Sequence, residues 1–219
     1  VTTTVEKEPE VTITKTINEV DYTIENKTYH KGQIMIQYPE IRGLDNKELE
    51  KEVNQVLQGF SINNSKDYTD LDTYELNYEV ATQSEEMISI VMKGYQNVVG
   101  AAHPSNFVGS LNVDLVNGKI VRLADVENVE EVAQRILNLT SLVIRDIDGN
   151  VIEGDYKEAV DDYLSYYEKD RLIEELRRFD LNTETNSWAE GYSYYKNGKL
   201  HIYFGVPHVI GDFIDIEFE

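Results

Sequence analysis

The segment that decides the fold is QIMIQYPEIRGLDNKELEKEVNQVLQGF, residues 33–60, because the period of its apolar residues changes once. Its first part is rich in Ile and Tyr and predicts a strand, which we expect Pro39 to end. In the second part the apolar residues fall on one face of a helix. They are Leu49, Val53, Val56, Leu57 and Phe60. With Asp45 or Asn46 as N-cap, the segment predicts a helix over residues 46–60 that packs on the first sheet.

Strand-like runs rich in Val, Ile, Thr and Tyr lie on both sides of this helix. They cover residues 11–20, 21–30, 73–83, 86–100 and 107–126. The last run predicts a hairpin around Asn117-Gly118, a pair that suits a type I′ turn. The polar residues 1–10 predict a tether.

The helical period returns in the second half of the chain. From Asn128 the apolar residues again follow one helix face, and residues 154–179 predict a second helical region or two short helices. The chain then returns to strands. A hairpin is predicted on Asn197-Gly198, and strict alternation from Phe213 to Phe218 predicts a final strand.

Strands and helices thus occur in groups rather than in strict alternation. This grouping predicts an α+β fold with mainly antiparallel sheets packed with helices. The polar connection at residues 61–72 is the best candidate for a domain boundary. We therefore expect two small α+β subdomains after the tether, at residues 11–70 and 71–219.

The charge of the chain excludes some classes of partner. The 219 residues include 41 acidic and 20 basic ones, which gives a formal net charge of −21. A phosphate backbone or an anionic membrane surface would be repelled, so we expect no nucleic-acid binding. A basic partner would be attracted, although an acidic surface can also serve solubility alone.

The sequence contains no cysteine, so disulfides and thiolate chemistry are excluded. It contains no apolar run long enough to span a bilayer. Because the chain begins at Val1, we expect it to be a piece of a longer or processed protein, with any signal peptide or anchor upstream.

No motif of the sequence predicts catalysis. The histidines are His30, His103, His201 and His208. None has the spacing of a zinc helix motif, although His103 and His208 could meet in space. There is no nucleophile elbow and no glycine-rich phosphate loop, and Ser110 is interpreted as a strand residue. We therefore expect no catalytic residue, no metal and no cofactor.

The acidic stretch Asp146–Asn150 is similar to the start of a calcium loop. Asp146, Asp148 and Asn150 fit its first three ligand positions, but Glu153 comes too soon for the last one. The stretch therefore predicts a turn.

The tyrosines are the remaining signal, since there are fifteen of them. Tyr192, Tyr194 and Tyr203 lie in predicted strands near the C-terminus. Such residues can form an exposed amphipathic face that binds glycans or proteins. Alternatively, they are half-buried strand residues of a sheet face.

Three stretches, in this order, resemble one known family. IQYPEIRGLDNKELEKEVNQ, residues 36–55, gives a strand, Tyr-Pro-x-Ile-x-Gly-Leu and a helix with an Asn at its middle. GAAHPSNFVGSLNVDLVNGKIVRLADV, residues 100–126, gives His-Pro, a strand, Asp-Leu-x-x-Gly-Lys and Leu-x-Asp. GVPHVIGDFIDIEFE, residues 205–219, gives a Pro-x-x-x-Gly corner and a strand. Together they resemble the paired extracytoplasmic domains of PdaC/RsiV-like bacterial proteins.

The resemblance implies a PdaC-like subdomain at residues 11–70 and an RsiV-like one at 71–219. In this family the pair occurs at the N-terminus of peptidoglycan deacetylases and in an anti-sigma factor that binds lysozyme. It implies a non-catalytic extracytoplasmic binding or sensing domain whose ligand is a cell-wall glycan or a wall-directed protein such as lysozyme. The alternative is a cell-wall polymer hydrolase, or a deacetylase-associated accessory domain, that uses a carboxylate pair.

The candidate binding residues lie at the two landmarks and among the tyrosines. They are His103, Pro104, Pro207, His208, Tyr192, Tyr194 and Tyr203. For His103-Pro104 a stiff corner, a ligand contact and catalysis are the alternatives. The sequence departs from the family at Ala101, where Gly is common, and at FGVPH, where a Tyr-Glu pair often precedes the corner. Because of these departures, the resemblance alone does not transfer the lysozyme-binding surface of the family to this sequence.

Overall fold

The computed structural model describes residues 20–63, 65–69, 71–181 and 189–219. The tether expected at residues 1–10 and, except for Val20, the strand expected at 11–20 lie outside this part of the chain. None of the helices in the described part has the length and apolar character needed to cross a membrane.

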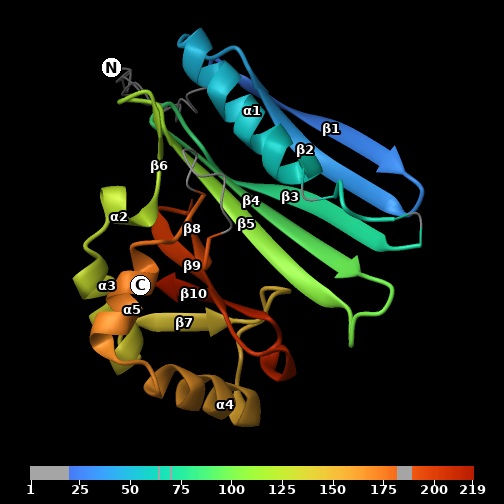
Figure 1. Cartoon of the computed structure of the whole chain (residues 1–219). Helices are drawn as coiled ribbons and strands as arrows, with labels where there is room; N and C mark the ends of the chain where they lie inside the picture. The colour runs from blue at the N-terminus through green and yellow to red at the C-terminus, as the bar shows by residue number, and fades with distance from the viewer. Residues whose placement is uncertain (1–19, 64, 70, 182–188) are drawn as a thin grey trace, which may run out of the picture.

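A six-stranded sheet, here the large sheet, forms the first half of the described chain (Figure 1). Its strands follow one another in chain order, and every neighbouring pair is antiparallel except β2 and β3. The strands are β1 (Thr23–Lys31), β2 (Ile34–Arg42), β3 (Thr73–Gln83), β4 (Met87–Asn97), β5 (Ser105–Asp114) and β6 (Lys119–Val121). Because β2 and β3 are parallel, the chain must cross over between them, and α1 (Lys47–Asn63) forms this crossover.

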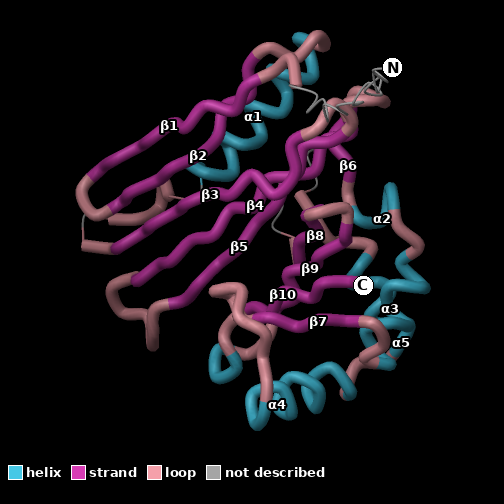
Figure 2. The backbone as a smooth tube through the Cα atoms, turned by 180° about the vertical axis from the view of Figure 1, so that it is seen from behind, coloured by secondary structure: helices cyan, strands magenta, loops and turns pink. Residues whose placement is uncertain are grey.

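A four-stranded antiparallel sheet, here the small sheet, follows with the order β7-β10-β9-β8. Its strands are β7 (Leu142–Arg145), β8 (Gly191–Lys196), β9 (Lys199–Gly205) and β10 (Phe213–Phe218). The remaining helices gather around the small sheet (Figure 2). They are α2 (Leu123–Val126), α3 (Val129–Asn138), α4 (Gly154–Ser165), α5 (Lys169–Leu176) and the 3-10 turn η1 (His208–Ile210). The predicted α+β fold with mainly antiparallel sheets is confirmed.

Helix α1 lies along one face of the large sheet, as its apolar pattern predicts (Figure 1). Leu49, Val53 and Leu57 are at most 3% exposed. Phe60 lies over Gly109 of β5, where a Cβ atom would come within 2.2 Å of the phenyl ring. The glycine therefore makes room for the last aromatic residue of the helix face.

Two polar side chains of α1 fix the turn that leads into the helix. The Asn54 amide pairs with the backbone of Ile41, accepting from its N–H and donating to its carbonyl oxygen, both at 2.7 Å. The Glu50 carboxylate accepts from the N–H groups of Gly43 and Leu44 at 2.7 and 2.8 Å. Gly43 has a φ of 99°, which favours glycine. The motif Ile-x-Gly-Leu with a helical Asn is thus a strand-to-helix junction.

Pro39 does not end β2, contrary to expectation, and pairs with Asn26 inside the β1–β2 ladder. The N–H of Ile41 points away from β1, since it donates to Asn54 of α1. N–H groups two positions apart point to the same side of a strand, so the nitrogen of Pro39 also faces away from β1. Among the described residues, β2 has no strand partner on that side beyond Ile36. A proline there removes no ladder hydrogen bond.

The chain changes from one sheet to the other near residue 122 rather than at the expected boundary between residues 70 and 71. The polar connection at 61–72 leads from the crossover helix into β3, which pairs with β2. A polar, turn-rich stretch is the sequence pattern of a linker, but here it is a loop inside one sheet.

A buried polar seam joins the two sheets. It consists of Ser89, Ser110, Asn112, Asp180 and Ser193, each at most 5% exposed. Side chains of the large sheet bond to the open backbone edge of β8: Asn112 donates to the Ser193 carbonyl oxygen at 2.9 Å, and Ser89 accepts from the N–H of Tyr195 at 2.9 Å. The seam therefore satisfies an edge strand that would otherwise leave polar groups unpaired. Ser110 is a strand residue, as predicted.

Asp180 is the centre of this seam. One carboxylate oxygen accepts from the N–H of Ser193 at 2.5 Å and from the hydroxyl of Ser110 at 3.3 Å. The other accepts from the N–H of Leu123 at 2.7 Å and from the hydroxyl of Ser193 at 2.6 Å. Burial raises the pKa of Asp180 to about 6 despite these donors. One carboxylate thus connects β5, β8 and the start of α2.

The two predicted hairpins differ in their turns. Asn197 and Gly198 have φ values of 54° and 74° and join β8 to β9 as a two-residue loop, as a type I′ turn requires. At the other hairpin only Gly118 has a positive φ, and four residues separate Asp114 from its partner in β6. The Asp114 carboxylate accepts from the N–H of Asn117 at 2.8 Å, which holds the longer loop. The hairpin is therefore confirmed, but its type I′ turn is not.

Candidate functional site

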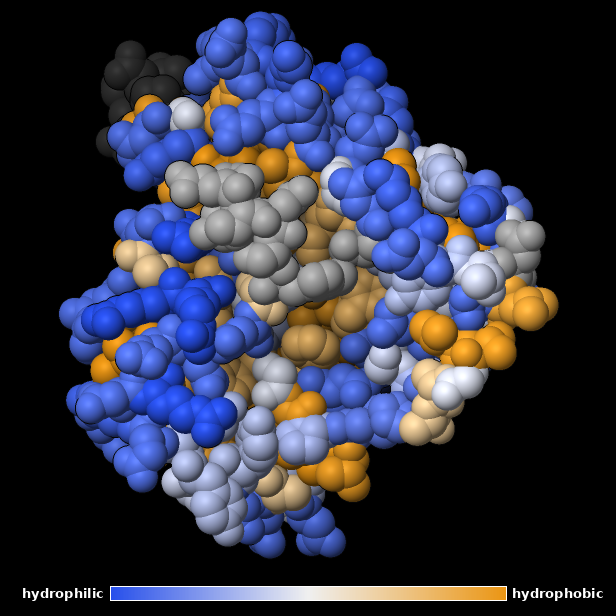
Figure 3. Space-filling model, in the orientation of Figure 1, coloured by the Kyte–Doolittle hydropathy of each residue, from blue (hydrophilic) through white to orange (hydrophobic). Residues whose placement is uncertain are grey.

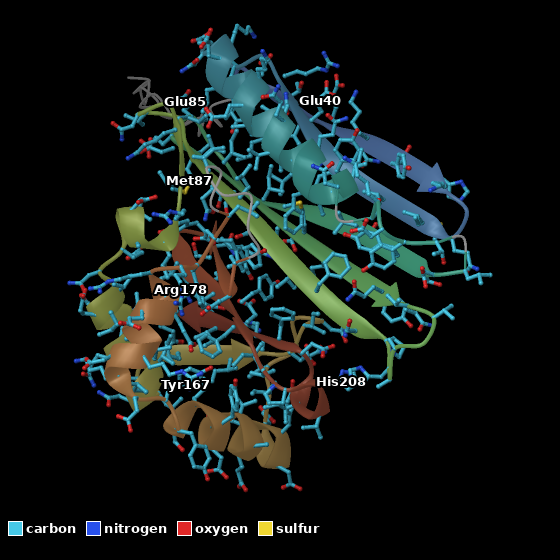
Figure 4. The ribbon with its side chains drawn as sticks, viewed as in Figure 1. Glu40, Glu85, Met87, Tyr167, Arg178 and His208 are labelled. Atoms are coloured by element: carbon cyan, nitrogen blue, oxygen red, sulfur yellow. The ribbon has the colours of Figure 1, made fainter. Side chains whose placement is uncertain are left out.

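The two family landmarks meet at one exposed corner of the molecule. His103 lies in the β4–β5 loop, His208 begins η1, and their rings stack with centroids 3.7 Å apart and an interplanar angle of 10°. Figure 4 shows His208 beside the end of this loop. Pro104 and Pro207, the neighbours of the two histidines, are exposed as well. The expectation that His103 and His208 could meet in space is confirmed.

Hydrogen bonds hold this corner in place. His103 Nδ1 donates to the carbonyl oxygen of Pro104 at 2.8 Å, and His208 Nδ1 donates to Asp212 at 2.9 Å. The other carboxylate oxygen of Asp212 accepts from the N–H of Asn106 in β5 at 3.0 Å. Asp212 therefore connects the corner of the small sheet to the large sheet.

Three exposed apolar side chains lie on the segments that form this corner or are bonded to it. Leu71 is 72% exposed, Val99 is 66% exposed and Val209 is 89% exposed. Figure 3 shows apolar surface at this end of the large sheet. Val99 is fixed there because its N–H donates to Asp72 at 2.8 Å. We call Leu71, Val99, His103, His208 and Val209 the apolar tip.

The three candidate tyrosines do not belong to the apolar tip. Tyr192, Tyr194 and Tyr203 are at most 4% exposed, and they pack between the two sheets in the same core as α1 and the large sheet. Tyr192 meets the edge of Phe60 with ring centroids 6.3 Å apart. The face of β8 and β9 that carries them is covered by the large sheet, so the exposed tyrosine face considered from the sequence is not formed.

Tyr194 and Tyr203 instead line a cleft of about 510 Å³ between the sheets, here the interlayer cleft. Its walls come from β3 and β4 of the large sheet, from the inner face of the small sheet and from the turn after β7. A volume of this size falls within the range of small-molecule sites.

A buried polar network forms the floor of the interlayer cleft. Tyr194 donates to Asp215 at 2.7 Å, and His201 Nδ1 lies 3.2 Å from the other oxygen of that carboxylate. The Tyr194 ring stacks on His201 and on Tyr203, with centroids 4.6 and 5.1 Å apart. Burial raises the pKa of Tyr194 far above its usual value, and the Asp215 carboxylate adds to this effect. Tyr194 is therefore a permanent donor to Asp215.

The stretch Asp146–Asn150 is a turn, as predicted, and borders the interlayer cleft. Asp146 accepts from the N–H groups of Asp148 and Asn150 at 3.0 and 2.8 Å, and Gly149 has a φ of 92°. The carboxylate of Asp146, which would be the first ligand of a calcium loop, is thus already bound by N–H groups of the turn. Nowhere in the described part of the chain do three or more His, Asp or Glu side chains come together as metal ligands.

The sequence reasoning missed His201, Asp215 and Lys93 as residues of a common site. Strand alternation could have placed His201 and Tyr203 on one face of β9 with Asp215 opposite, since Asp215 pairs with Tyr203. It could not have shown that the large sheet covers this face, because that contact depends on the packing of the two sheets.

Comparisons with known proteins agree with the resemblance seen in the sequence. Residues 22–106 match the family model described as "Deacetylase PdaC". Among solved structures, the chain is similar to a DUF3298 family protein from Pseudomonas aeruginosa, with 11% identity, coverage of 92% of this chain and 91% of that chain, and a TM-score of 0.49. It is also similar to a member of the same family from Bacteroides fragilis, with 13% identity, coverage of 91% and 88%, and a TM-score of 0.40. No curated protein matches the chain.

The matched residues begin just before β1, include the strand-to-helix junction at Gly43 and end at residue 106 in β5, shortly after His103. They also extend across the boundary expected at residue 70. The family match bears out the PdaC part of the resemblance, and it does so for residues 22–106 of the chain.

Proposed function

We propose that the chain is a non-catalytic, extracytoplasmic binding or sensing domain of a bacterial envelope protein. Its ligand is a basic protein directed at the cell wall, such as lysozyme, and the apolar tip is the surface that binds it. The family match and the sequence resemblance support the envelope setting.

The apolar tip is the observation that carries this proposal. Large apolar side chains are normally scattered singly over a surface, whereas contiguous apolar patches mark interaction sites. Here Val99 and Val209 are both exposed, and the stacked pair of His103 and His208 brings together the loops that carry them. Stacked imidazoles with an apolar surround suit the buried centre of a protein interface.

The formal net charge of −21 supports a basic partner. Long-range attraction accelerates the encounter with a cationic protein and weakens with salt, since the screening length is about 8 Å at physiological ionic strength. Attraction of this kind does not give a specific complex by itself. The apolar tip would add contacts that salt does not screen.

The experiment is titration calorimetry with lysozyme at about 0.15 M salt, with a basic protein of similar charge as the reference. The test variant combines Val99→Ser with Val209→Ser. Val116→Ser is the matched control, because Val116 is 73% exposed in the β5–β6 loop, outside the apolar tip. We expect lysozyme to bind better than the reference protein. We also expect the test variant to weaken binding about tenfold or more, and the control to leave it unchanged.

Equal binding of lysozyme and the reference protein would remove the basis of the proposal. Loss of all binding at moderate salt would do the same, because it would leave only unspecific charge attraction.

A second candidate function is favoured by the description of the matching family model. "Deacetylase PdaC" suggests an accessory domain of an enzyme that acts on a wall polymer. Its test is an assay of the isolated chain on peptidoglycan for released acetate and new reducing ends. Either product would favour the enzymatic alternative, and binding of peptidoglycan without any product would favour an accessory domain with a glycan ligand.

A further inference from the structure

We propose that the interlayer cleft is a separate binding site for a small zwitterion, namely a peptide of two or three residues with a free ammonium and a free carboxylate group. The proposal is independent of lysozyme binding, because the residues that line the interlayer cleft and the residues of the apolar tip do not overlap.

The floor of the interlayer cleft is polar where the fold would favour apolar residues. On β10, Ile214 and Ile216 face the helices and are fully buried, while Asp215 between them faces the cleft and is 5% exposed. A buried carboxylate costs free energy unless it is hydrogen-bonded, and here Tyr194 and His201 supply the bonds. His201 uses Nδ1 for this contact, so Nε2 remains for a ligand.

Most charged side chains around the interlayer cleft already contact a side chain of opposite charge. Glu217 accepts from Arg145 at 2.9 Å and from Lys199 at 2.5 Å, and Glu79 pairs with Lys196. The hydrogen bond from Lys199 and then that from Arg145 lower the pKa of Glu217, so its charge is retained. A ligand with several charges of one sign would therefore meet repulsion from one half of the wall.

Two lining residues of opposite charge are left without an ionic partner among the described residues. No carboxylate of the described residues lies within 4.0 Å of Lys93 Nζ, which donates to the carbonyl oxygen of Ile147 at 3.0 Å and lies 5.5 Å from the centre of the Tyr203 ring. Asp148 follows Ile147 in the chain, and in the part of the chain that the structure describes no cation lies within 4.0 Å of its carboxylate. Lys93 is suited to a ligand carboxylate and Asp148 to a ligand ammonium.

The size of the interlayer cleft limits the ligand further. About 510 Å³ exceeds what a single small amino acid fills, and it is too small for a folded partner. A peptide of two or three residues also brings backbone N–H and carbonyl groups for the polar floor. The two charges and the polar floor thus select the same class of ligand.

The probe is trialanine, and two capped forms of it serve as controls. N-acetyl-trialanine lacks the ammonium group, and trialanine amide lacks the carboxylate group. Binding is measured by calorimetry up to about 10 mM ligand. The variants Lys93→Met and Asp148→Asn are compared with Lys66→Met and Asp162→Asn, whose side chains are exposed outside the interlayer cleft.

We expect wild-type protein to bind trialanine, and each cap to weaken binding about tenfold or more, because each removes a charge-assisted contact. Lys93→Met should weaken the binding of trialanine to the same extent. It should not weaken the binding of trialanine amide any further, because the amide lacks the carboxylate that Lys93 would contact. Asp148→Asn should behave in the same way toward the N-acetyl form. Asp148 is exposed on a turn, so this arm remains informative even if Lys93→Met disturbs folding.

Two results would overturn the proposal. One is the absence of trialanine binding to the wild-type protein at about 10 mM. The other is binding that is equally strong for trialanine and its capped forms. Binding that the control variants weaken as much as Lys93→Met and Asp148→Asn do would count in the same way. The variant Val99→Ser/Val209→Ser should bind trialanine like wild type, so failure of the lysozyme proposal and failure of this one can be told apart.

Discussion

Replacement of Asp180 by Asn tests the account of how the two sheets are joined. Both oxygens of the carboxylate accept from a backbone N–H, Ser193 on one side at 2.5 Å and Leu123 on the other at 2.7 Å. An Asn side chain has only one oxygen, so its NH₂ group must face one of these two donors. The serine hydroxyls can rotate and become acceptors, but the backbone N–H cannot.

The expected loss follows from that one mispaired donor. A buried N–H group without an acceptor costs about 1–3 kcal/mol, so Asp180→Asn should lower the free energy of unfolding by about this amount at pH 7. The measurement is urea unfolding followed by circular dichroism. Asp162→Asn is the matched control, because Asp162 is exposed on α4, and it should change the free energy by less than about 0.5 kcal/mol.

The pH dependence gives the same reasoning a second test. Burial raises the pKa of Asp180 from 3.8 to about 6, so the folded state holds this proton more tightly than the unfolded chain does. The resulting stability is fully present below pH 3.8 and is lost as the pH rises through about 6. The difference corresponds to about 3 kcal/mol.

Asn does not titrate, and the other carboxylates are common to both proteins. The stability difference between wild type and Asp180→Asn should therefore shrink by up to about 3 kcal/mol between pH 4 and pH 7. A difference that stays constant over this range, or a variant as stable as wild type at both ends, would refute the assigned role of burial.

Two further substitutions test the packing of α1 by urea unfolding. Asn54→Ala removes both hydrogen bonds to Ile41 and should cost about 1–3 kcal/mol, whereas an unchanged midpoint would mean that the junction does not depend on them. Gly109→Ala places a methyl group 2.2 Å from the Phe60 ring and should cost about 1–3 kcal/mol. The control Gly59→Ala, whose methyl group meets only a flexible side chain at 3.5 Å, should be neutral or stabilising by up to about 1 kcal/mol, and equal losses in both glycine variants would contradict the close approach of Phe60.

Much of the fold could be predicted because local patterns determine it. The spacing of Leu49, Val53 and Phe60 gives the buried face of α1, and the pair Asn197-Gly198 gives the turn between β8 and β9. These features depend on residues a few positions apart, which a single sequence displays directly. Pro39 misled the prediction because its effect depends on which edge of β2 is paired.

The candidate site could be predicted only in part. His103 and His208 were chosen at two separate landmarks, and the structure brings them together at the exposed corner. The buried positions of Tyr194 and Tyr203 could not be foreseen, because strand alternation gives two faces without showing which one the other sheet covers. Asp180 had no local signal, since its partners lie far from it in the sequence.

The apolar tip as the surface that binds a basic wall-directed protein is the central claim, and hydrogen exchange by mass spectrometry tests it most directly. Amide exchange of the chain is compared with and without lysozyme at about 0.15 M salt. We expect slower exchange at residues 95–104 and 206–212, which carry the apolar tip except for Leu71, and no change at the β8–β9 turn of the interlayer cleft. Unchanged exchange at residues 95–104 and 206–212 in a complex that calorimetry shows to be formed would contradict the claim.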